Sequence, residues 1–445
     1  MPSTASVYRA RWVLSNRAGS IEDGAVVCAD GRIARVGPWS RLQPHVGARD
    51  AVEDFGESAI LPGFVNGHTH LAYPQRGTRP SFANPALRSP LRRAKQRASE
   101  GENAERGTKD FVGWLSRLTA QRLASGPAAI RRAIRDGARA SVAAGTCAGA
   151  DLAPDARLCK CLAPHAAHWT VFGELFRFGR AGLERLARAV RTLDDLACRT
   201  GLRVGLAPHS PYTAGVEVFA AARQEADARG WPVSAHLHET LDEIEFTRSG
   251  QGDLHKWLSL AQFLPKDLAP LGKRPIPALA EAGFFKGPVL VAHGNYLTDE
   301  EMAILARSRS SVAYCPRSHA FFGHADHPWR RLLAAGANVC LGTDSLASSP
   351  SLSVLDEMRC LAAEHADADP RLILEMATVR GARALGFADD LGDLAEGLRA
   401  DFCVLGPVAQ TLDPLAAILG GEGSVRKVLV AGEDLPGANR REIVG

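Results

Sequence analysis

The sequence predicts an α/β protein, a (β/α)8 TIM barrel that carries a small β-domain built from both ends of the chain. Three observations support this prediction. Eight short apolar runs recur through the middle of the 445-residue chain, and helix-like stretches separate most of them. Residue types that bind metals follow several of these runs directly. Both ends of the chain, in contrast, contain short strand-like runs bounded by turns.

The β-domain is expected from residues 1–60 and 391–445. Asp30-Gly31 separates two short apolar runs near the N-terminus, and Asp-Gly is a favoured turn of β-hairpins. Near the C-terminus, residues 400–405 and 427–432 are further short apolar runs. The barrel would then span residues 61–390.

The predicted barrel strands lie near residues 61–67, 145–150, 169–174, 203–208, 232–237, 288–292, 311–315 and 338–343. Helix-like stretches between them include residues 128–144, 183–200, 216–229, 299–308 and 327–335. Eight strands that alternate with helices favour a closed parallel barrel over an open sheet. Two connections, 71–127 and 240–286, are too long for simple crossovers, and we expect them to shape a substrate pocket.

Ligand-type residues end four of the predicted strands. They are His68 and His70 after the first strand, His236 after the fifth, His293 after the sixth and Asp344 after the eighth. The carboxyl ends of barrel strands meet at one face, so these residues are expected to converge. Imidazoles with a carboxylate suit a catalytic Zn²⁺ or similar divalent ion with an open position for water. One His-x-His pair alone would more often be surface histidine, but its recurrence with other ligand types predicts a metal-dependent hydrolase.

Composition limits the remaining classes of function. The net charge is +4, and the basic residues are spread among acidic ones, which argues against nucleic-acid binding. No apolar run is long enough to cross a membrane, and the N-terminus lacks a signal peptide's apolar core. The nine cysteines, several of them inside apolar runs, suggest reduced thiols and a cytoplasmic protein. A small-molecule substrate is expected, and a homodimer is the commonest assembly for such a protein.

Six segments together resemble the amidohydrolase superfamily: LPGFVNGHTH, APHSPYT, SAHLHET, VAHGNYLTDEE, AYCPRS and LGTDSLASSPSL. They are most similar to its branch of mononuclear-metal aminohydrolases. That branch includes adenosylhomocysteine, methylthioadenosine, aminofutalosine and guanine deaminases, and the triazine chlorohydrolases. The resemblance spans almost the whole chain, and the terminal runs DGRIARVGP and GDLAEGLRADFCVLGP resemble the β-sandwich that these enzymes build from both ends.

The resemblance implies a role for each candidate residue. His68, His70, His236 and Asp344 would together hold one divalent ion. Zn²⁺ is the first choice for this ion, and Fe²⁺ or Mn²⁺ are the alternatives. The expected catalytic residues are Glu239 as proton shuttle, His293 beside the attacking water or the developing oxyanion, and Asp344. The expected substrate contacts are His209, His319, Phe322 and Ser345.

These roles imply a hydrolase that acts on carbon–nitrogen bonds other than peptide bonds, a deaminase of an amino-purine nucleoside or related heteroaryl amine. A cyclic amidase of the hydantoinase or dihydroorotase type would need a carboxylated lysine on the fourth strand, where RVGLAPHS has none. A heteroaryl chlorohydrolase is also compatible with the ligand set, whereas a non-catalytic scaffold is disfavoured because every ligand position is occupied. His319 and Ser349 stand where many relatives have Asn, so the substrate stays open, as do the roles of Glu174 and the loop 319–327.

Overall fold

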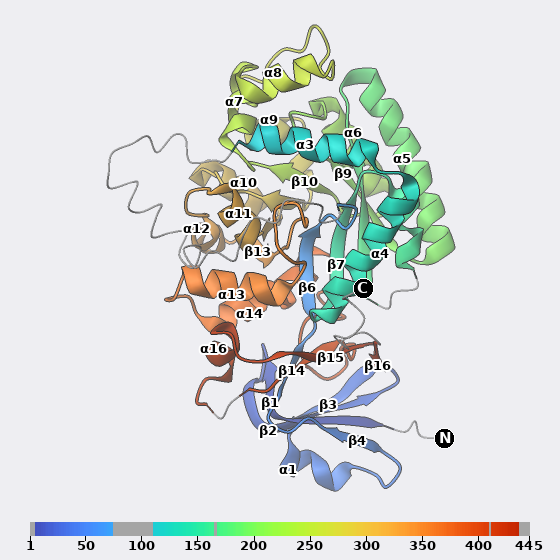
Figure 1. The fold of residues 1–445 in the computed structure, drawn as a ribbon, viewed down its shortest axis with the longest axis vertical. Helices are drawn as coiled ribbons and strands as arrows, with labels where there is room; N and C mark the ends of the chain where they lie inside the picture. The colour runs from blue at the N-terminus through green and yellow to red at the C-terminus, as the bar shows by residue number, and fades with distance from the viewer. Residues whose placement is uncertain (1–4, 74–109, 164–166, 409–410, 436–445) are drawn as a thin grey trace.

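The computed structural model describes residues 5–73, 110–163, 167–408 and 411–435. Residues 74–109, most of the first long insertion, lie outside this range. A mixed β-sheet forms one end of the molecule, and an α/β body with helices around parallel strands forms the rest (Figure 1). Among the described residues, no helix combines the length and apolar character needed to cross a membrane.

The α/β body contains the eight predicted strands, all parallel to their neighbours. They are β6 (Phe64–Thr69), β7 (Thr146–Ala153), β8 (His168–Leu175), β9 (Arg203–Pro208), β10 (Ser234–Leu237), β11 (Leu290–His293), β12 (Ser311–Tyr314) and β13 (Asn338–Leu341). They pair as two four-stranded sheets, β6-β7-β8-β9 and β10-β11-β12-β13. The sheets meet at both edges through single parallel bridges, Leu206 with Val233 and Thr69 with Asp344. The fold is therefore TIM-barrel-like, but a continuous eight-stranded ladder is absent from the described residues, because each seam between the two sheets is joined by a single bridge.

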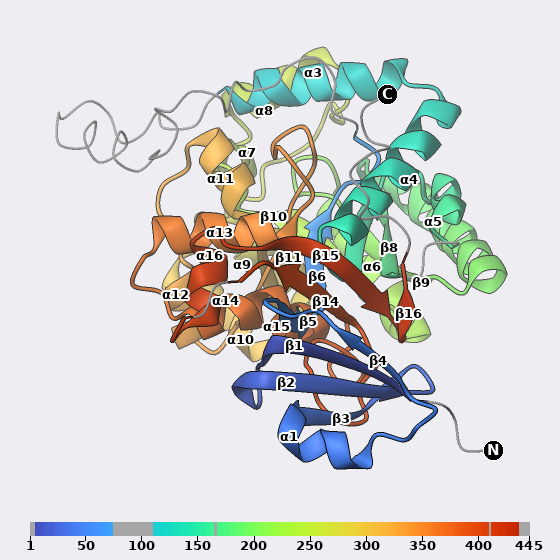
Figure 2. The ribbon, with the colours of Figure 1, turned by 60° about the horizontal axis from the view of Figure 1, so that its bottom comes forward.

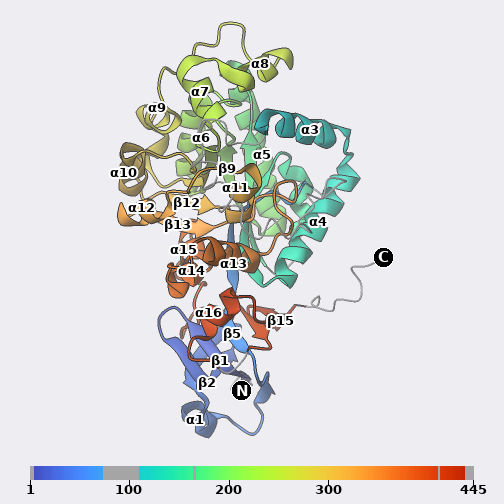
Figure 3. The same cartoon turned by 60° about the vertical axis from the view of Figure 1, so that its left-hand side comes forward.

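Helices follow most of these strands and cover their outer faces (Figures 1 and 3). They are α4 (Pro127–Ala143), α5 (Gly179–Thr200), α6 (Val216–Arg229), α9 (Pro275–Glu281), α10 (Asp299–Arg307), α11 (Pro316–Phe322), α12 (Trp329–Ala334), α13 (Val354–Glu364), α14 (Pro370–Ala377) and α15 (Val379–Ala384), with 3₁₀ turns at Ala156–Leu162 and Phe284–Lys286. In α5 the buried residues Leu186, Val190 and Leu193 recur every three or four positions, which gives the helix one apolar face toward the strands. Thr298 and Glu301 form a capping box at the start of α10, and Asp299, Glu300 and Glu301 make its first turn acidic.

The terminal segments form one mixed sheet in the order β16-β15-β14-β5-β1-β2-β3, with β4 paired to β1. Its strands are β1 (Ser6–Ser15), β2 (Gly19–Ala29), β3 (Arg32–Pro38), β4 (Ala51–Asp54), β5 (Ala59–Pro62), β14 (Phe402–Gly406), β15 (Ser424–Val430) and β16 (Glu433–Asp434), with α1 (Trp39–Leu42), a 3₁₀ turn (Gln43–His45) and α16 (Pro414–Leu419) beside them. The two ends of the chain meet where β14 pairs with β5. The expected sandwich is a single sheet here, because β1 pairs with β4 along its first half and with β5 along its second.

The helices of the two long insertions that the structure describes lie at the end of the body away from the mixed sheet (Figure 1). α3 (Phe111–Ala124) crosses this end, and α7 (Leu241–Ser249) and α8 (Gly252–Leu260) lie beside it (Figures 1 and 2). An aromatic cluster joins these helices to α11, with Phe111, Tyr212, Phe246 and Phe322 buried and Trp114, Trp257 and Phe263 packed against them. The described helices α3, α7 and α8 therefore lie over the end of the body at which the ligand-type residues emerge (Figure 1).

Candidate active site

Three histidines from two distant strands converge at this edge. The ligand nitrogens of His68, His70 and His236 all lie within 4.8 Å of one another, and the Nε2 atoms of His70 and His236 are 3.1 Å apart. Asp344 adds a carboxylate, since its Oδ1 lies 3.8 Å from Nε2 of His68 and 3.9 Å from Nε2 of His70. All four side chains are buried. The sequence-predicted ligand set is therefore brought together in space.

The backbone at the seam between β6 and β13 holds two of these residues in register. The amides of Thr343 and Asp344 both donate to the carbonyl of His68, at 3.0 and 3.1 Å. Gly342 makes this approach possible, because a Cβ there would lie 2.9 Å from Cβ of His68. Asp344 itself has a φ of 54° and His293 a φ of 70°, left-handed conformations that non-glycine residues seldom adopt and that cluster at functional sites.

Hydrogen bonds orient the ligand atoms toward a common centre. Nδ1 of His70 donates to the carbonyl of Leu152 at 3.1 Å, which leaves the Nε2 lone pair free. The hydroxyls of Ser318 and Ser348 donate to Oδ2 of Asp344 at 2.7 and 2.6 Å, so Oδ1 is the oxygen that faces the histidines. Burial opposes ionisation of Asp344, but the close approach of His68 and the charges of His293, His68 and His70 hold its pKa well below the ordinary range.

The residues fit a divalent cation. Both ring nitrogens of His68 are buried without a hydrogen-bond partner among the described residues, although such groups are normally satisfied. Donor atoms of a tetrahedral site with bonds of about 2.0–2.1 Å lie about 3.3 Å apart, close to the observed separations. Burial lowers the pKa of His68, which favours the neutral imidazole that binds metals.

Glu239 and His293 lie next to this group and next to each other. Nε2 of His293 is 3.6 Å from Oε1 of Glu239, and both side chains are less than a tenth exposed. Burial, reinforced by the charges of Asp344 and Glu243, raises the pKa of Glu239 well above its ordinary value. A buried carboxyl group with a raised pKa can hold a proton near neutral pH and release it again, as a general acid–base must.

The turn that carries Glu239 is fixed by residues that the sequence analysis did not single out. Glu243 accepts hydrogen bonds from the amides of His238 and Glu239, at 3.0 and 2.9 Å. Asn295 donates from Nδ2 to the Glu239 carbonyl at 2.9 Å. The only signal in the sequence is that Glu243 follows Glu239 by four positions, and this spacing is equally common on solvated helix faces.

His238 also has a defined place, since Nε2 is 3.1 Å from Oε1 of the buried Glu301, which pairs with Arg274 as well. Burial disfavours the ionised form of Glu301, but its interactions with His238 and Arg274 outweigh that effect and lower its pKa to about 2.

The four predicted substrate residues take different positions. His209 has its ring 4.6 Å from that of His236, and its Nδ1 is 2.7 Å from the hydroxyl oxygen of Thr213. His319 is hydrogen-bonded through Nδ1 to Oδ1 of Asn295 at 3.1 Å. Ser345 accepts from the Ala347 amide at 3.3 Å, and Phe322 packs in the aromatic cluster against Phe111 and Trp114. The substrate contacts of all four stay predictions.

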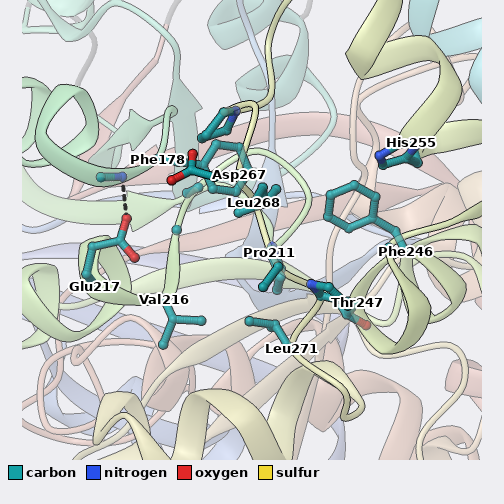
Figure 4. Close-up of a pocket in the computed structure, with 17 residues that line it drawn as sticks. Phe178, Pro211, Val216, Glu217, Phe246, Thr247, His255, Asp267, Leu268 and Leu271 are labelled. Atoms are coloured by element: carbon teal, nitrogen blue, oxygen red, sulfur yellow. Dashed lines mark hydrogen bonds between the residues drawn. The ribbon is translucent and has the colours of Figure 1, made fainter.

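A cavity of about 350 Å³ lies among the loops at the same end of the strands as α7 (Figure 4). Its walls come from the loops before α5 and α6, from α7 and from the segment 265–271, and Phe178, Pro211 and Phe246 line it. None of the ligand-type residues is among the residues that line it.

Comparison with known proteins relates almost the whole chain to one family. The sequence profile of the amidohydrolase family matches residues 59–435. A 5-methylthioadenosine/S-adenosylhomocysteine deaminase of Desulforudis audaxviator is 31% identical over 396 residues, which cover 86% of this chain and 81% of that protein. The protein of the same name from Thermococcus sibiricus is 33% identical over 219 residues, and here the match covers 48% of this chain and only 46% of the relative.

Solved structures show the same fold. An aminofutalosine deaminase of Helicobacter pylori in complex with methylthio-coformycin is similar with a TM-score of 0.78 and 22% identity, over 97% of this chain and 100% of that one. An adenosine deaminase of Xanthomonas campestris with bound zinc has a TM-score of 0.75 and 24% identity, over 98% and 93% of the two chains.

Proposed function

The chain belongs to the amidohydrolase family, and on this premise we propose that it is a metal-dependent aminohydrolase. It hydrolyses a carbon–nitrogen bond of an amino-purine nucleoside or a related heteroaryl amine and releases ammonia. One observation carries the proposal: three imidazoles, the Asp344 carboxylate and the buried Glu239 meet at one edge of the parallel strands. The deaminase names of relatives that align along most of the chain support it.

His68, His70, His236 and Asp344 would hold one divalent ion, for which Zn²⁺ is the first choice. When bound, such an ion supplies a Lewis acid that lowers the pKa of water toward neutrality. Ser318 and Ser348 would keep Oδ1 of Asp344 aimed at the ion, because they occupy Oδ2. The zinc in the Xanthomonas campestris neighbour supports this choice of metal.

The residues of the chain then move protons. Asp344 and Glu239 take up the proton of the attacking water, and Glu239 delivers one to the ring nitrogen beside the carbon that bears the amine. Protonation makes that carbon electrophilic, so the water oxygen adds to it, and His293 faces the developing oxyanion. Glu239 then takes the proton of the newly added hydroxyl group and passes it to the amine. The carbon–nitrogen bond breaks, ammonia leaves and the ring keeps a carbonyl group.

The proposal includes the domain organisation. A closed (β/α)8 barrel over residues 61–390 would carry the site at the carboxyl ends of its strands, with residues 1–60 and 391–445 as the β-domain. The bridges at both seams and the pairing of β14 with β5 support this division. The segments 71–127 and 240–286 are expected to close over the substrate, and residues 74–109 of the first lie outside the described residues.

Replacement of Glu239 tests the mechanism. Glu239→Gln keeps the size of the side chain but removes the base, so metal content should stay at the wild-type level while kcat falls about 10²-fold or more. His236→Ala should lose both metal and activity. Loss of metal in Glu239→Gln would make Glu239 a ligand, and the shuttle role would then be wrong.

A further inference from the structure

Glu174 ends β8 with a carboxylate that the mechanism above does not use. Its side chain is 1% exposed, and both carboxylate oxygens are buried without a hydrogen-bond partner among the described residues. An unsatisfied buried carboxylate is strongly unfavourable, so such a group normally has a partner that the folded protein meets in use. This makes Glu174 a candidate for contact with a ligand.

The carboxylate faces the site already described. Oε1 of Glu174 is 4.0 Å from Nε2 of His209, and ligand atoms of Glu174, His209 and His236 lie within 4.8 Å of one another. Thr213 engages the other ring nitrogen of His209, so Nε2 is the atom left to face Glu174. Phe176 packs its ring 5.0 Å from that of His209 and forms a flat apolar wall beside the pair.

A second metal ion is not the occupant that the surroundings favour. His236 already belongs to the first ligand group. The guanidinium groups of Arg122 and Arg185 both lie over the ring of Phe176, two residues beyond Glu174, at 5.9 and 5.5 Å from its centre. Burial raises the pKa of Glu174, the charges of His70, Arg122 and Arg185 act against that shift, and Asp151 adds to it. Two nearby positive charges would repel a divalent cation. A neutral group that donates hydrogen bonds meets no such repulsion.

We propose that Glu174 and His209 form a substrate subsite that accepts a pair of hydrogen-bond donors. The pair is either the vicinal hydroxyls of a ribose or the two N–H groups of the exocyclic amine. This inference rests on the proposed function and names what the substrate must present. A carboxylate with two free oxygens accepts two adjacent donors side by side, as acidic residues do at the ribose of dinucleotides.

Binding of inosine and 2′,3′-dideoxyinosine to the zinc-loaded protein, measured by titration calorimetry, distinguishes the two sources. Inosine has no exocyclic amine and does not react further. If ribose is the ligand, wild type binds inosine about 10- to 100-fold more tightly than the dideoxy compound, and Glu174→Gln removes that difference. If the amine is the ligand, the two inosines bind alike, and Glu174→Gln lowers kcat/KM for adenosine about 10- to 100-fold without changing the Kd of inosine.

Thermal unfolding separates a binding role from a structural one. Because the unpaired carboxylate destabilises the ligand-free protein, Glu174→Gln should keep or raise the Tm. Glu364→Gln is the matched control, because Glu364 on α13 is a partly buried carboxyl group that accepts a hydrogen bond from the Cys360 thiol. This control variant should keep wild-type inosine binding and turnover.

Three results would overturn the subsite. They are wild-type binding and turnover in Glu174→Gln, a clear drop in its Tm, or a second equivalent of metal in wild type that the variant lacks. Wild type that discriminates the two inosines but releases no ammonia from any nucleoside would refute the proposed function and leave the subsite standing.

Discussion

Gly342→Ala should weaken metal binding at the proposed site although Gly342 has no side chain to offer. The added Cβ would lie 2.9 Å from Cβ of His68 and 3.0 Å from its backbone nitrogen and oxygen. Carbon atoms pack favourably at about 3.5–4.0 Å, so β6 and the end of β13 must separate by about 0.6–1 Å. The hydrogen bonds from Thr343 and Asp344 to the His68 carbonyl tie the two segments together, so the displacement also moves the proposed ligands His68 and Asp344.

Metal ligands tolerate displacements of about 0.2 Å, so the separation exceeds the tolerance several-fold. We expect zinc affinity to fall about 10²-fold or more, with kcat/KM falling in parallel, and overpacking to cost about 1–3 kcal/mol of stability. Metal per chain after dialysis against buffered zinc, with the Tm of the zinc-free protein, measures both effects. Gly37→Ala is the control, because a Cβ there meets nothing within 4 Å. Zinc affinity of Gly342→Ala within twofold of wild type would refute the close-approach argument.

Two further substitutions test the surroundings of the site. Ser348→Ala removes one of the two hydroxyls on Oδ2 of Asp344, and loss of a charged hydrogen bond of about 1.5–3 kcal/mol should weaken zinc binding about tenfold or more; an unchanged zinc Kd would show that Ser318 alone suffices. Glu301 has its pKa lowered from 4.5 to about 2, which corresponds to about 3 kcal/mol of stability that is present above pH 4.5 and lost as the pH falls through 2. Denaturant unfolding of Glu301→Gln should therefore show a deficit against wild type at pH 7 that shrinks toward pH 2, and a deficit independent of pH would contradict this.

The sequence predicts the body of the fold well, because its signals are local. Apolar runs that end in polar residues locate all eight parallel strands, and α6 begins and ends at the predicted residues. How the strands close is a different matter. The bridge between Thr69 and Asp344 joins segments 275 residues apart, and the fork of β1 between β4 and β5 depends on pairing that no local pattern encodes.

The candidate site divides in the same way. Histidines and Asp344 at strand ends can be recognised because ligand types after apolar runs are unusual. The groups that aim them cannot, since Ser318, Ser348 and Glu243 are ordinary residues whose importance comes from the atoms they reach. The unpartnered state of Glu174 is likewise visible only once the fold has buried it.

Ammonia release by purified, zinc-loaded protein tests the central claim most directly. Adenosine, 5′-methylthioadenosine, S-adenosylhomocysteine and guanine should be offered beside dihydroorotate, hydantoin and a chlorotriazine, with ammonia, ring opening and chloride measured in parallel. The account predicts ammonia from at least one amino-purine, at a rate that Glu239→Gln lowers about 10²-fold, and negligible opening of either cyclic amide. Ring opening of dihydroorotate or hydantoin, or chloride release, with every amino-purine left intact would contradict it.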